Sequence, residues 1–419
     1  MATTVEIPGS KQMTRPSDHT AQNERKRILF VDDEPHLLAG LKRALRPLRH
    51  EWDMVFVGSG AEALQLAEQM PFDAVVSDMR MPGMDGAELL GEIARRHPRT
   101  VRIILSGYSD EASVMGLVDR AHQFLAKPCD AVRLQSVLTR SFALQGLLTD
   151  ERLQAIVSSL DALPSLPLIY RKLTRLLRSE DATVRAVGAL IAEDPPMTAK
   201  LLQVVNSAFF SIGRRITNPE EAASLVGMDV LRGLALVSGI FRQFEASGSN
   251  VRTAWLERLW RHSLLVGHLA QEVAKRENVD RATVDDAMTA GLLHDIGMLV
   301  FAFRMPAVWD QVQVLVRSAD IPHWDAEVRI AGVPHNVLGA YLLGLWGLPQ
   351  SIVEAVACNR QPPRTPLLEF TPLTAVHVAN ALVCGEERLD WDYLEALGLG
   401  DRLEAWRTMA DNLTSDIAV

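Results

Sequence analysis

The chain has 419 residues, of which 48% are hydrophobic and 23% are charged, so it can form two or three domains with sizeable buried cores. The formal net charge of −9 argues against broad nucleic-acid binding, and three scattered cysteines make neither a disulfide framework nor a paired-cysteine metal site. The N-terminus lacks an apolar signal core, and no run approaches the roughly 18 uninterrupted apolar residues of a membrane helix. We therefore expect a cytoplasmic protein that binds neither nucleic acid nor membrane.

The chain begins with an aperiodic polar segment, residues 1–26, which we expect to be a disordered tail. Short apolar runs then alternate with segments of helical spacing. The expected strands are residues 27–33, 53–58, 72–78, 101–107 and 122–127, and the expected helices between them are 36–48, 60–69, 85–97 and 111–121. Five strand-then-helix units predict an α/β domain, residues 27–145, built on a doubly wound five-stranded parallel sheet with helices on both faces.

The remainder of the chain has helical patterns only. Helical spacing continues almost unbroken over residues 130–160, so we expect one long helix that ends the first domain and becomes a helical linker over 146–160. Residues 161–400 predict an all-α second domain, in which Asp194 and Asn218, each followed by proline, are expected helix N-caps. The final segment, 401–419, is a weakly patterned end.

Polar residues stand at the carboxyl ends of four expected strands. Asp32 and Asp33 follow the first strand, Asp78 ends the third, and Ser106 and Lys127 end the fourth and fifth. In an open parallel sheet this edge is where ligands bind. Three carboxylates there repel one another unless a cation neutralises them, and oxygen ligands suit Mg²⁺. Asp78 can then act as a nucleophile toward a phosphoryl group, with Lys127 balancing the charge and Ser106 hydrogen-bonding a phosphoryl oxygen.

The motifs "VDDE", "SDMRMPGMDG", "LSGYSD" and "FLAKP" resemble the receiver domain of two-component response regulators, which has a flavodoxin-like fold. The resemblance covers about residues 27–145. It implies that Asp78 accepts a phosphoryl group from a sensor histidine kinase. It also implies a Mg²⁺ site formed by Asp32, Asp33 and Asp78 with the main-chain carbonyl of Arg80.

The same resemblance assigns the remaining residues of that edge. Ser106 and Lys127 would contact the phosphoryl group. Phe124 falls where receivers carry a switch aromatic, which turns inward when the hydroxyl residue moves. A domain of this kind serves chiefly as a signalling switch.

The helical region contains a second set of chemistry-bearing residues, His262, His294, Asp295 and His335, spread over three expected helices. Histidines and a carboxylate that face one pocket are how helical bundles build metal sites. A divalent ion held there lowers the pKa of a bound water for attack on a phosphate ester. For the other histidines, including His377, we expect ordinary core or surface roles.

This set resembles the HD superfamily of metal-dependent phosphohydrolases, and more closely its HDOD branch, whose members often lack a working metal site. The segments "LIAEDPPMTAKLLQVVNSAFF", "ITNPEEAASLVGMDVLRGLAL" and "HNVLGAYLLGLWGLPQSIVEAV" carry the resemblance, which covers about residues 160–385. Where active phosphodiesterases place further ligands, this chain has Cys358-Asn359-Arg360 and Asn380. We therefore expect a vestigial HD site in which a metal is doubtful and a two-metal centre improbable.

Three functions follow from these features. The first is a non-catalytic response regulator whose HDOD output domain binds a protein partner, with a homodimer left open. The second is a receiver-regulated metal-dependent phosphohydrolase. The third is a DNA-binding regulator with a helix-turn-helix within residues 186–240, which the acidic balance and the lack of any basic cluster richer than Arg214-Arg215 disfavour.

Overall fold

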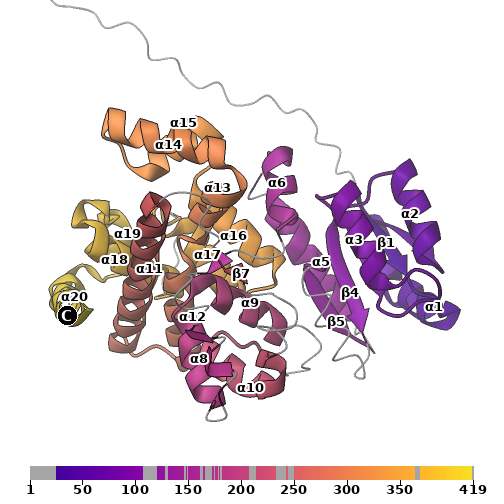
Figure 1. The fold of residues 1–419 in the computed structure, drawn as a ribbon, viewed down its shortest axis with the longest axis horizontal. Helices are drawn as coiled ribbons and strands as arrows, with labels where there is room; N and C mark the ends of the chain where they lie inside the picture. The colour runs from indigo at the N-terminus through magenta and orange to yellow at the C-terminus, as the bar shows by residue number, and fades with distance from the viewer. Residues whose placement is uncertain are drawn as a thin grey trace, which may run out of the picture.

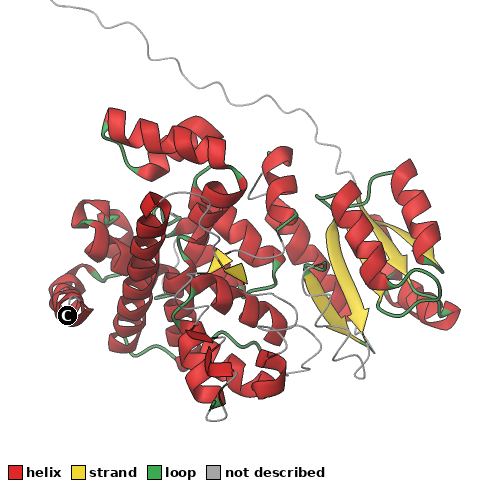
Figure 2. Cartoon of the chain, viewed as in Figure 1, coloured by secondary structure: helices red, strands yellow, loops and turns green. Residues whose placement is uncertain are grey.

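The computed structural model describes residues 25–106, 120–127, 131–145, 150–160, 182–206, 214–232, 250–363 and 369–417, with a few isolated residues between 148 and 243. The expected tail and most of the expected helix at 111–121 lie outside these residues. Figure 1 shows an α/β part at one end of the molecule and a large helical part at the other, with α5 and α6 between them. Figure 2 shows that, in the described chain, the strands gather in the first part apart from one short pair.

The α/β part is a parallel sheet of order β2-β1-β3-β4-β5. Its strands are β1 (Lys26–Val31), β2 (Trp52–Val57), β3 (Ala74–Asp78), β4 (Val101–Ser106) and β5 (Gln123–Ala126). The predicted five-stranded doubly wound sheet is thereby confirmed. Its central strands read as continuous apolar runs because helices cover both faces.

The helices of the sheet's crossovers agree with the predicted segments. They are α1 (Pro35–Ala44), the 3₁₀ turn η1 (Arg46–His50), α2 (Gly60–Gln69) and α3 (Gly86–Arg96). Ser59 and Asp85 accept hydrogen bonds from the third residue of α2 and α3 and so begin these helices.

The expected single helix over residues 130–160 is wrong, because the segment contains two helices. The first is α5 (Ala131–Gln145) and the second is α6 (Glu151–Ser158). The backbone of Asp150 is extended, and its carboxylate accepts hydrogen bonds from the main-chain amides of Arg152 and Leu153. That N-cap starts a new helix, so helical periodicity alone hid the break.

Among the described residues, the second part is helical except for one two-stranded pair. Its elements are β6 (Pro164–Ser165), α8 (Val184–Ala192), α9 (Pro195–Val205), α10 (Pro219–Arg232), β7 (Arg242–Gln243), α11 (Asn250–Arg276), α12 (Arg281–Leu293), α13 (Ile296–Arg304), α14 (Pro306–Ala319), α15 (His323–Ala331), α16 (His335–Leu345), α17 (Gln350–Cys358), α18 (Pro372–Cys384), η4 (Glu386–Arg388), α19 (Trp391–Ala396), η5 (Gly400–Arg402) and α20 (Leu403–Ile417). Both predicted caps are confirmed, since Asp194 accepts from the amide of Met197 and Asn218 from those of Glu220 and Glu221. The expected weak end at 401–419 instead forms α20, whose Trp406 is fully buried.

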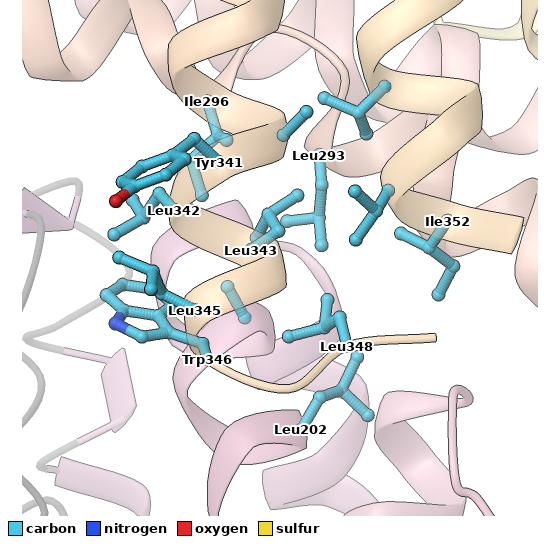
Figure 3. Packing of buried hydrophobic residues seen from close by; sticks show 14 of the residues in the cluster. Leu202, Leu293, Ile296, Tyr341, Leu342, Leu343, Leu345, Trp346, Leu348 and Ile352 are labelled. Atoms are coloured by element: carbon cyan, nitrogen blue, oxygen red, sulfur yellow. The ribbon is translucent and has the colours of Figure 1, made fainter. Parts of the chain in front are cut away.

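Helix α16 is buried along its length, and Figure 3 shows apolar side chains packed along it. Tyr341, Leu342 and Leu345 are each at most 1% exposed. The stretch Arg281–Arg304, which spans α12 and α13, is long and apolar enough to cross a membrane by length and composition. However, 83% of its most apolar window is buried inside the protein, as in a core helix pair of a globular domain.

The two parts are joined through a buried interface. Their buried apolar side chains form one connected cluster, and α5 and α6 both contact α16. A polar link accompanies this packing: Gln203 of α9 donates from Nε2 to the main-chain carbonyl of His122, next to β5, over 3.0 Å. The receiver-side sheet edge and the helical core are therefore in direct contact.

Candidate functional site

The carboxyl edge of the sheet brings three carboxylates together. One oxygen from each of Asp32, Asp33 and Asp78 lies within 4.8 Å of the others. Asp32 and Asp78 are buried, whereas Asp33 is exposed. They come from the ends of the neighbouring strands β1 and β3, which explains why residues 45 positions apart in the sequence meet.

Lys127 bridges this cluster from the end of β5. Its Nζ lies 2.7 Å from Asp32 Oδ2 and 2.6 Å from Asp78 Oδ1. Burial lowers the pKa of Lys127, but its bonds to the two carboxylates outweigh burial and raise the pKa overall. Burial raises the pKa of Asp78 despite the opposing effect of Lys127. This edge of the sheet therefore carries a cluster of negative charge, and the ammonium group of Lys127 is in contact with it.

The carboxylate cluster offers only hard oxygen donors, and this acidic pocket is typical of a Mg²⁺ site. The three side chains fit the ion by charge and spacing. The main-chain carbonyl of Arg80, expected as a further ligand, belongs to the loop directly after Asp78. Ser106 and Phe124 lie at the end of β4 and within β5, but their side chains are outside the described part of the structure.

Gly86 fixes the position of the Asp78 backbone. Its amide donates to the carbonyl of Met79 over 2.9 Å. A Cβ at residue 86 would overlap the main-chain carbonyl oxygen of Asp78. Only glycine allows the first turn of α3 to lie this close to the strand end, which accounts for the last residue of the "SDMRMPGMDG" motif.

The second cluster lies in the helical part, where α11 meets the α12–α13 turn. His262 Nε2 is 3.1 Å from His294 Nε2 and 3.6 Å from Asp295 Oδ2, and His294 Nε2 is 3.3 Å from Asp295 Oδ1. His294 Nδ1 donates to the carbonyl of Gly291, so its other ring nitrogen, Nε2, faces the other two residues. Burial, followed by the nearby His294, lowers the pKa of His262 to about 4, so His262 is neutral. These three residues fit one transition-metal ion, since two imidazole nitrogens and a carboxylate oxygen are suitable ligand atoms.

His335, the fourth predicted residue, is placed beside this cluster but is held by two carboxylates. Its Nε2 lies 3.0 Å from Asp295 Oδ1 and its Nδ1 lies 2.6 Å from Glu327 Oε2. Burial lowers the pKa of His335, but Glu327 and Asp295 outweigh burial and raise the pKa to about 9. An imidazolium that donates from both nitrogens has no lone pair for a metal.

Gly297 explains how Asp295 and His335 come so close. A Cβ at residue 297 would overlap the main-chain carbonyl oxygen of His335 at the start of α16. The glycine of "HDIG" therefore lets α13 and α16 approach each other. It has a packing role, and it positions the carboxylate of Asp295 against His335.

The residues that depart from the HD pattern form a cavity of about 240 Å³ beside the cluster, lined by Asn359, Arg360, Asn380 and Arg388 among others. Asn380 donates from Nδ2 to Asn359 Oδ1 over 3.2 Å, so the two side-chain amides are hydrogen-bonded to each other. The positive charges of Arg360 and Arg388 contribute to lowering the pKa of His262. The two arginines disfavour a second cation in this cavity, although the carboxylate of Asp325 also lines it.

Sequence reasoning missed several residues of this region. Glu327, fully buried against His335, was not singled out, because a glutamate in a helix ordinarily faces solvent. Cys384 lies 3.9 Å from His262 and was noted only as a lone cysteine. His377 has the expected core role, since its Nδ1 donates to the carbonyl of Asn359 and its Nε2 accepts from the amide of Asp390.

Two family models match the chain. The response regulator receiver domain matches residues 28–139, and the HDOD domain matches residues 163–362. Together these ranges contain the carboxylate cluster and the cluster around His294. Both resemblances drawn from the motifs are confirmed.

Individual relatives cover smaller shares. An uncharacterized protein of Treponema pallidum is 26% identical over 64% of this chain and 51% of its own length. The hydrogenase transcriptional regulatory protein HoxA of Cupriavidus necator is 30% identical over 41% of this chain and 35% of its own. The chain therefore spans about half or less of the curated relatives that it matches.

Among solved structures, the signal receiver domain of an HD domain-containing protein from Pseudomonas fluorescens is 31% identical. The match covers 29% of this chain and 98% of that chain, with a TM-score of 0.28.

A receiver domain joined to a separate output domain defines the class of response regulators. The output domain here is an HDOD domain, so the chain is a receiver–HDOD response regulator. The receiver domain implies a histidine kinase as partner.

Proposed function

We propose that this response regulator is switched by phosphorylation of Asp78 and that its HDOD domain passes the signal on by binding a protein partner, without catalysing hydrolysis. The observation that carries the first part is the convergence of Asp32, Asp33, Asp78 and Lys127 at one sheet edge. The proposal includes domain limits of 27–145 for the receiver, 146–160 for the linker and 161–400 for the output domain.

The chemistry at Asp78 is a transfer between two nucleophiles. A carboxylate oxygen of Asp78 attacks phosphorus as the bond from phosphorus to the kinase's histidine nitrogen breaks, which leaves an acyl phosphate. Asp32, Asp33, Asp78 and the Arg80 carbonyl would hold Mg²⁺, which supplies positive charge to the transferred group. Lys127, now 2.6 Å from Asp78, would turn its ammonium group to the new phosphoryl oxygens, and Ser106 would bond one of them.

The non-catalytic output is supported by the state of the HD residues. His335 is engaged by Glu327 and Asp295, and Asn380 stands where an aspartate ligand is expected in active phosphodiesterases. Arg360 and Arg388 line the adjacent cavity, and their positive charges oppose a second ion there. A two-metal mechanism, which clamps both the attacking and the leaving oxygen, lacks its second set of ligands here.

Intact mass spectrometry of the full chain tests phosphorylation directly. Incubation with acetyl phosphate and Mg²⁺ should add one phosphoryl group, and Asp78→Asn should abolish the addition. Asp320→Asn, an exposed change in a left-handed position that asparagine tolerates, is the matched control. A phosphoryl group that persists in Asp78→Asn would refute the proposed acceptor.

The second part needs a separate measurement. Hydrogen exchange in α9 and α16 should change on phosphorylation, because both helices contact the receiver side. Unchanged exchange throughout the HDOD domain would contradict a signal passed through this interface.

A second candidate function, a metal-dependent phosphohydrolase, is favoured by one observation: the ligand atoms of His262, His294 and Asp295 lie within 4.8 Å of one another. Metal-loaded full chain should then hydrolyse p-nitrophenyl phosphate, and His294→Ala with Asp295→Ala should abolish the activity. His268→Ala, an exposed change on α11, is the control. Absence of turnover in the metal-loaded wild type would eliminate this candidate.

A further inference from the structure

A polar cavity of about 330 Å³ lies between the two domains, away from both clusters described above. One wall comes from β5 and α5 of the receiver, and the other from α9, the segment before α10 and the end of α16. Its volume is at the lower end of the range for small-molecule sites, roughly 300–1,000 Å³. Neither the receiver chemistry nor the HD site uses it.

Arginines concentrate around this cavity from both domains. Arg133 and Arg140 belong to α5, and Arg214 and Arg215 precede α10. Arg214 is paired with Glu221. For the other three, no ion pair with a carboxylate is found in the described part of the chain.

Two pairs of these guanidinium groups repel each other, Arg140 with Arg215 and Arg215 with Arg133. Burial, and then the positive charge of Arg215, lowers the pKa of Arg140 to about 10. The pKa of Arg215 is lowered by burial and by Arg133, with Asp286 opposing these effects. The carboxylate of Asp286 accepts a hydrogen bond from Ser351 over 2.5 Å, so part of its capacity is already used. Arg133 and Arg215 are exposed and Arg140 is partly buried, so the positive charge concentrated at this cavity favours a bound anion.

Two buried polar atoms of cavity residues are also unsatisfied. Arg140 Nε and Gln203 Oε1 have no hydrogen-bond partner among the described residues. Gln203 is only 3% exposed, and its Nε2 is already committed to the carbonyl of His122. A ligand with both kinds of group could satisfy this donor and this acceptor together.

We propose that this cavity binds a small phosphate ester of mononucleotide size. Its phosphate group would lie among Arg133, Arg140 and Arg215, because guanidinium groups bond phosphate oxygens in pairs. A hydroxyl or amine of its organic part would donate to Gln203 Oε1. The indole of Trp346, which lines the cavity and is 3% exposed, offers an apolar wall to that organic part.

Such a ligand would hold the two domains together, since its arginine contacts come from α5 on one side and the segment before α10 on the other. Ligand binding and domain docking would then be linked, so each would strengthen the other. This inference does not depend on phosphorylation of Asp78 or on metal at His294.

Isothermal titration of the full chain with AMP, ribose 5-phosphate, inorganic phosphate and adenosine, at matched ionic strength, tests the proposal. The two esters should bind, adenosine should not, and inorganic phosphate should bind at least tenfold more weakly than AMP. Equal affinity for inorganic phosphate would overturn the assignment of an ester. Absence of binding by both esters would overturn the site.

Variants locate the binding. Arg140→Gln with Arg215→Gln should weaken AMP binding at least tenfold, and should not lower the melting temperature, because it relieves repulsion. Arg43→Gln with Arg258→Gln removes the same charge from exposed positions and should leave the affinity unchanged. Gln203→Met should bring the affinity for AMP down toward that for inorganic phosphate. Equal weakening by both double variants would mean that net charge, and not this cavity, attracts the ligand.

Discussion

The guanidinium of Arg102 in β4 donates from Nη2 to the main-chain carbonyl of Ser158 at the end of α6, over 2.8 Å. Both residues are buried, and His122 completes the arrangement. Because His122 Nδ1 accepts from the amide of Arg102, its ring proton is on Nε2, which also donates to the Ser158 carbonyl over 2.8 Å. The receiver sheet is thus hydrogen-bonded to α6, the helix that leads into the output domain.

Arg102→Gln should weaken this contact between the sheet and α6. The change removes the bond to Ser158 and a second bond, from Arg102 Nε to the carbonyl of Arg120, and their loss is expected to cost at least about 2 kcal/mol in the free energy of unfolding. Urea denaturation of the full chain measures the loss. The matched control is Arg99→Gln, which breaks an exposed ion pair between the sheet and the same helix, with Glu151, and should cost at most about 1 kcal/mol. Equal effects of the two changes would mean that the buried hydrogen bonds of Arg102 stabilise the fold no more than the exposed ion pair does.

His122 should make this interface sensitive to acid. Its pKa is lowered well below 6.5, first by burial and then by Arg102, with Lys200 adding to the effect and the Ser158 carbonyl opposing it. Below about pH 6.5 the unfolded chain therefore binds a proton at this residue that the folded chain does not. The free energy of unfolding contributed by His122 is complete above that pH and declines as the pH falls.

Urea titrations between pH 5 and pH 8 check this sign. His122→Gln should reduce the pH dependence below pH 6.5 by up to about 1.4 kcal/mol per pH unit, the value for one proton. His50→Gln, an exposed change, should keep the wild-type slope. The same slope in wild type and His122→Gln would exclude a neutral buried histidine at this interface.

The receiver site could be predicted well from the sequence because its functional residues lie at the ends of strands. The order of apolar runs determines which residues finish a parallel strand, and that alone brings Asp32 and Asp78 to one edge. The caps at Asp194 and Asn218 were predictable for a similar reason, since a cap is a local signal. Local rules and strand order do not require knowledge of tertiary packing.

The remaining features depend on contacts between distant segments. The role of Glu327 appears only when the start of α16 folds back against α15, and a lone helical glutamate carries no such signal. The break between α5 and α6 was overlooked because apolar spacing continues across it, although Asp150 before Glu151 is a recognisable start signal. The interdomain arginines come from α5 and from a segment more than seventy residues later, and no local pattern links them.

Gly86→Ala should impair the receiver selectively. The added Cβ overlaps the Asp78 carbonyl, so the strand end or α3 must shift, at a cost of about 1–3 kcal/mol, and phosphorylation of Asp78 should slow. Gly40→Ala in α1 meets nothing within 4 Å and should stabilise the receiver by up to about 1 kcal/mol. Mass spectrometry of acetyl phosphate reactions and urea denaturation provide the two measurements. A normal phosphorylation rate in Gly86→Ala would show that the Asp78 backbone tolerates displacement.

The HD cluster should bind one transition-metal ion per chain and not two. His262, His294 and Asp295 offer two imidazole nitrogens and a carboxylate, while His335 is held by Glu327 and the neighbouring cavity carries Arg360 and Arg388. Elemental analysis after dialysis against Zn²⁺, with excess Mg²⁺ to saturate the receiver, should therefore give one equivalent of zinc per chain.

Because removal of a ligand costs at least as much as loss of a supporting hydrogen bond, His294→Ala should lower Zn²⁺ affinity about 100-fold or more. His268→Gln, on the exposed face of α11, should bind as the wild type does. Two equivalents of zinc would mean that the pair formed by Asn359 and Asn380 opens to admit a second ion, and a hydrolytic role for the output domain would then regain support.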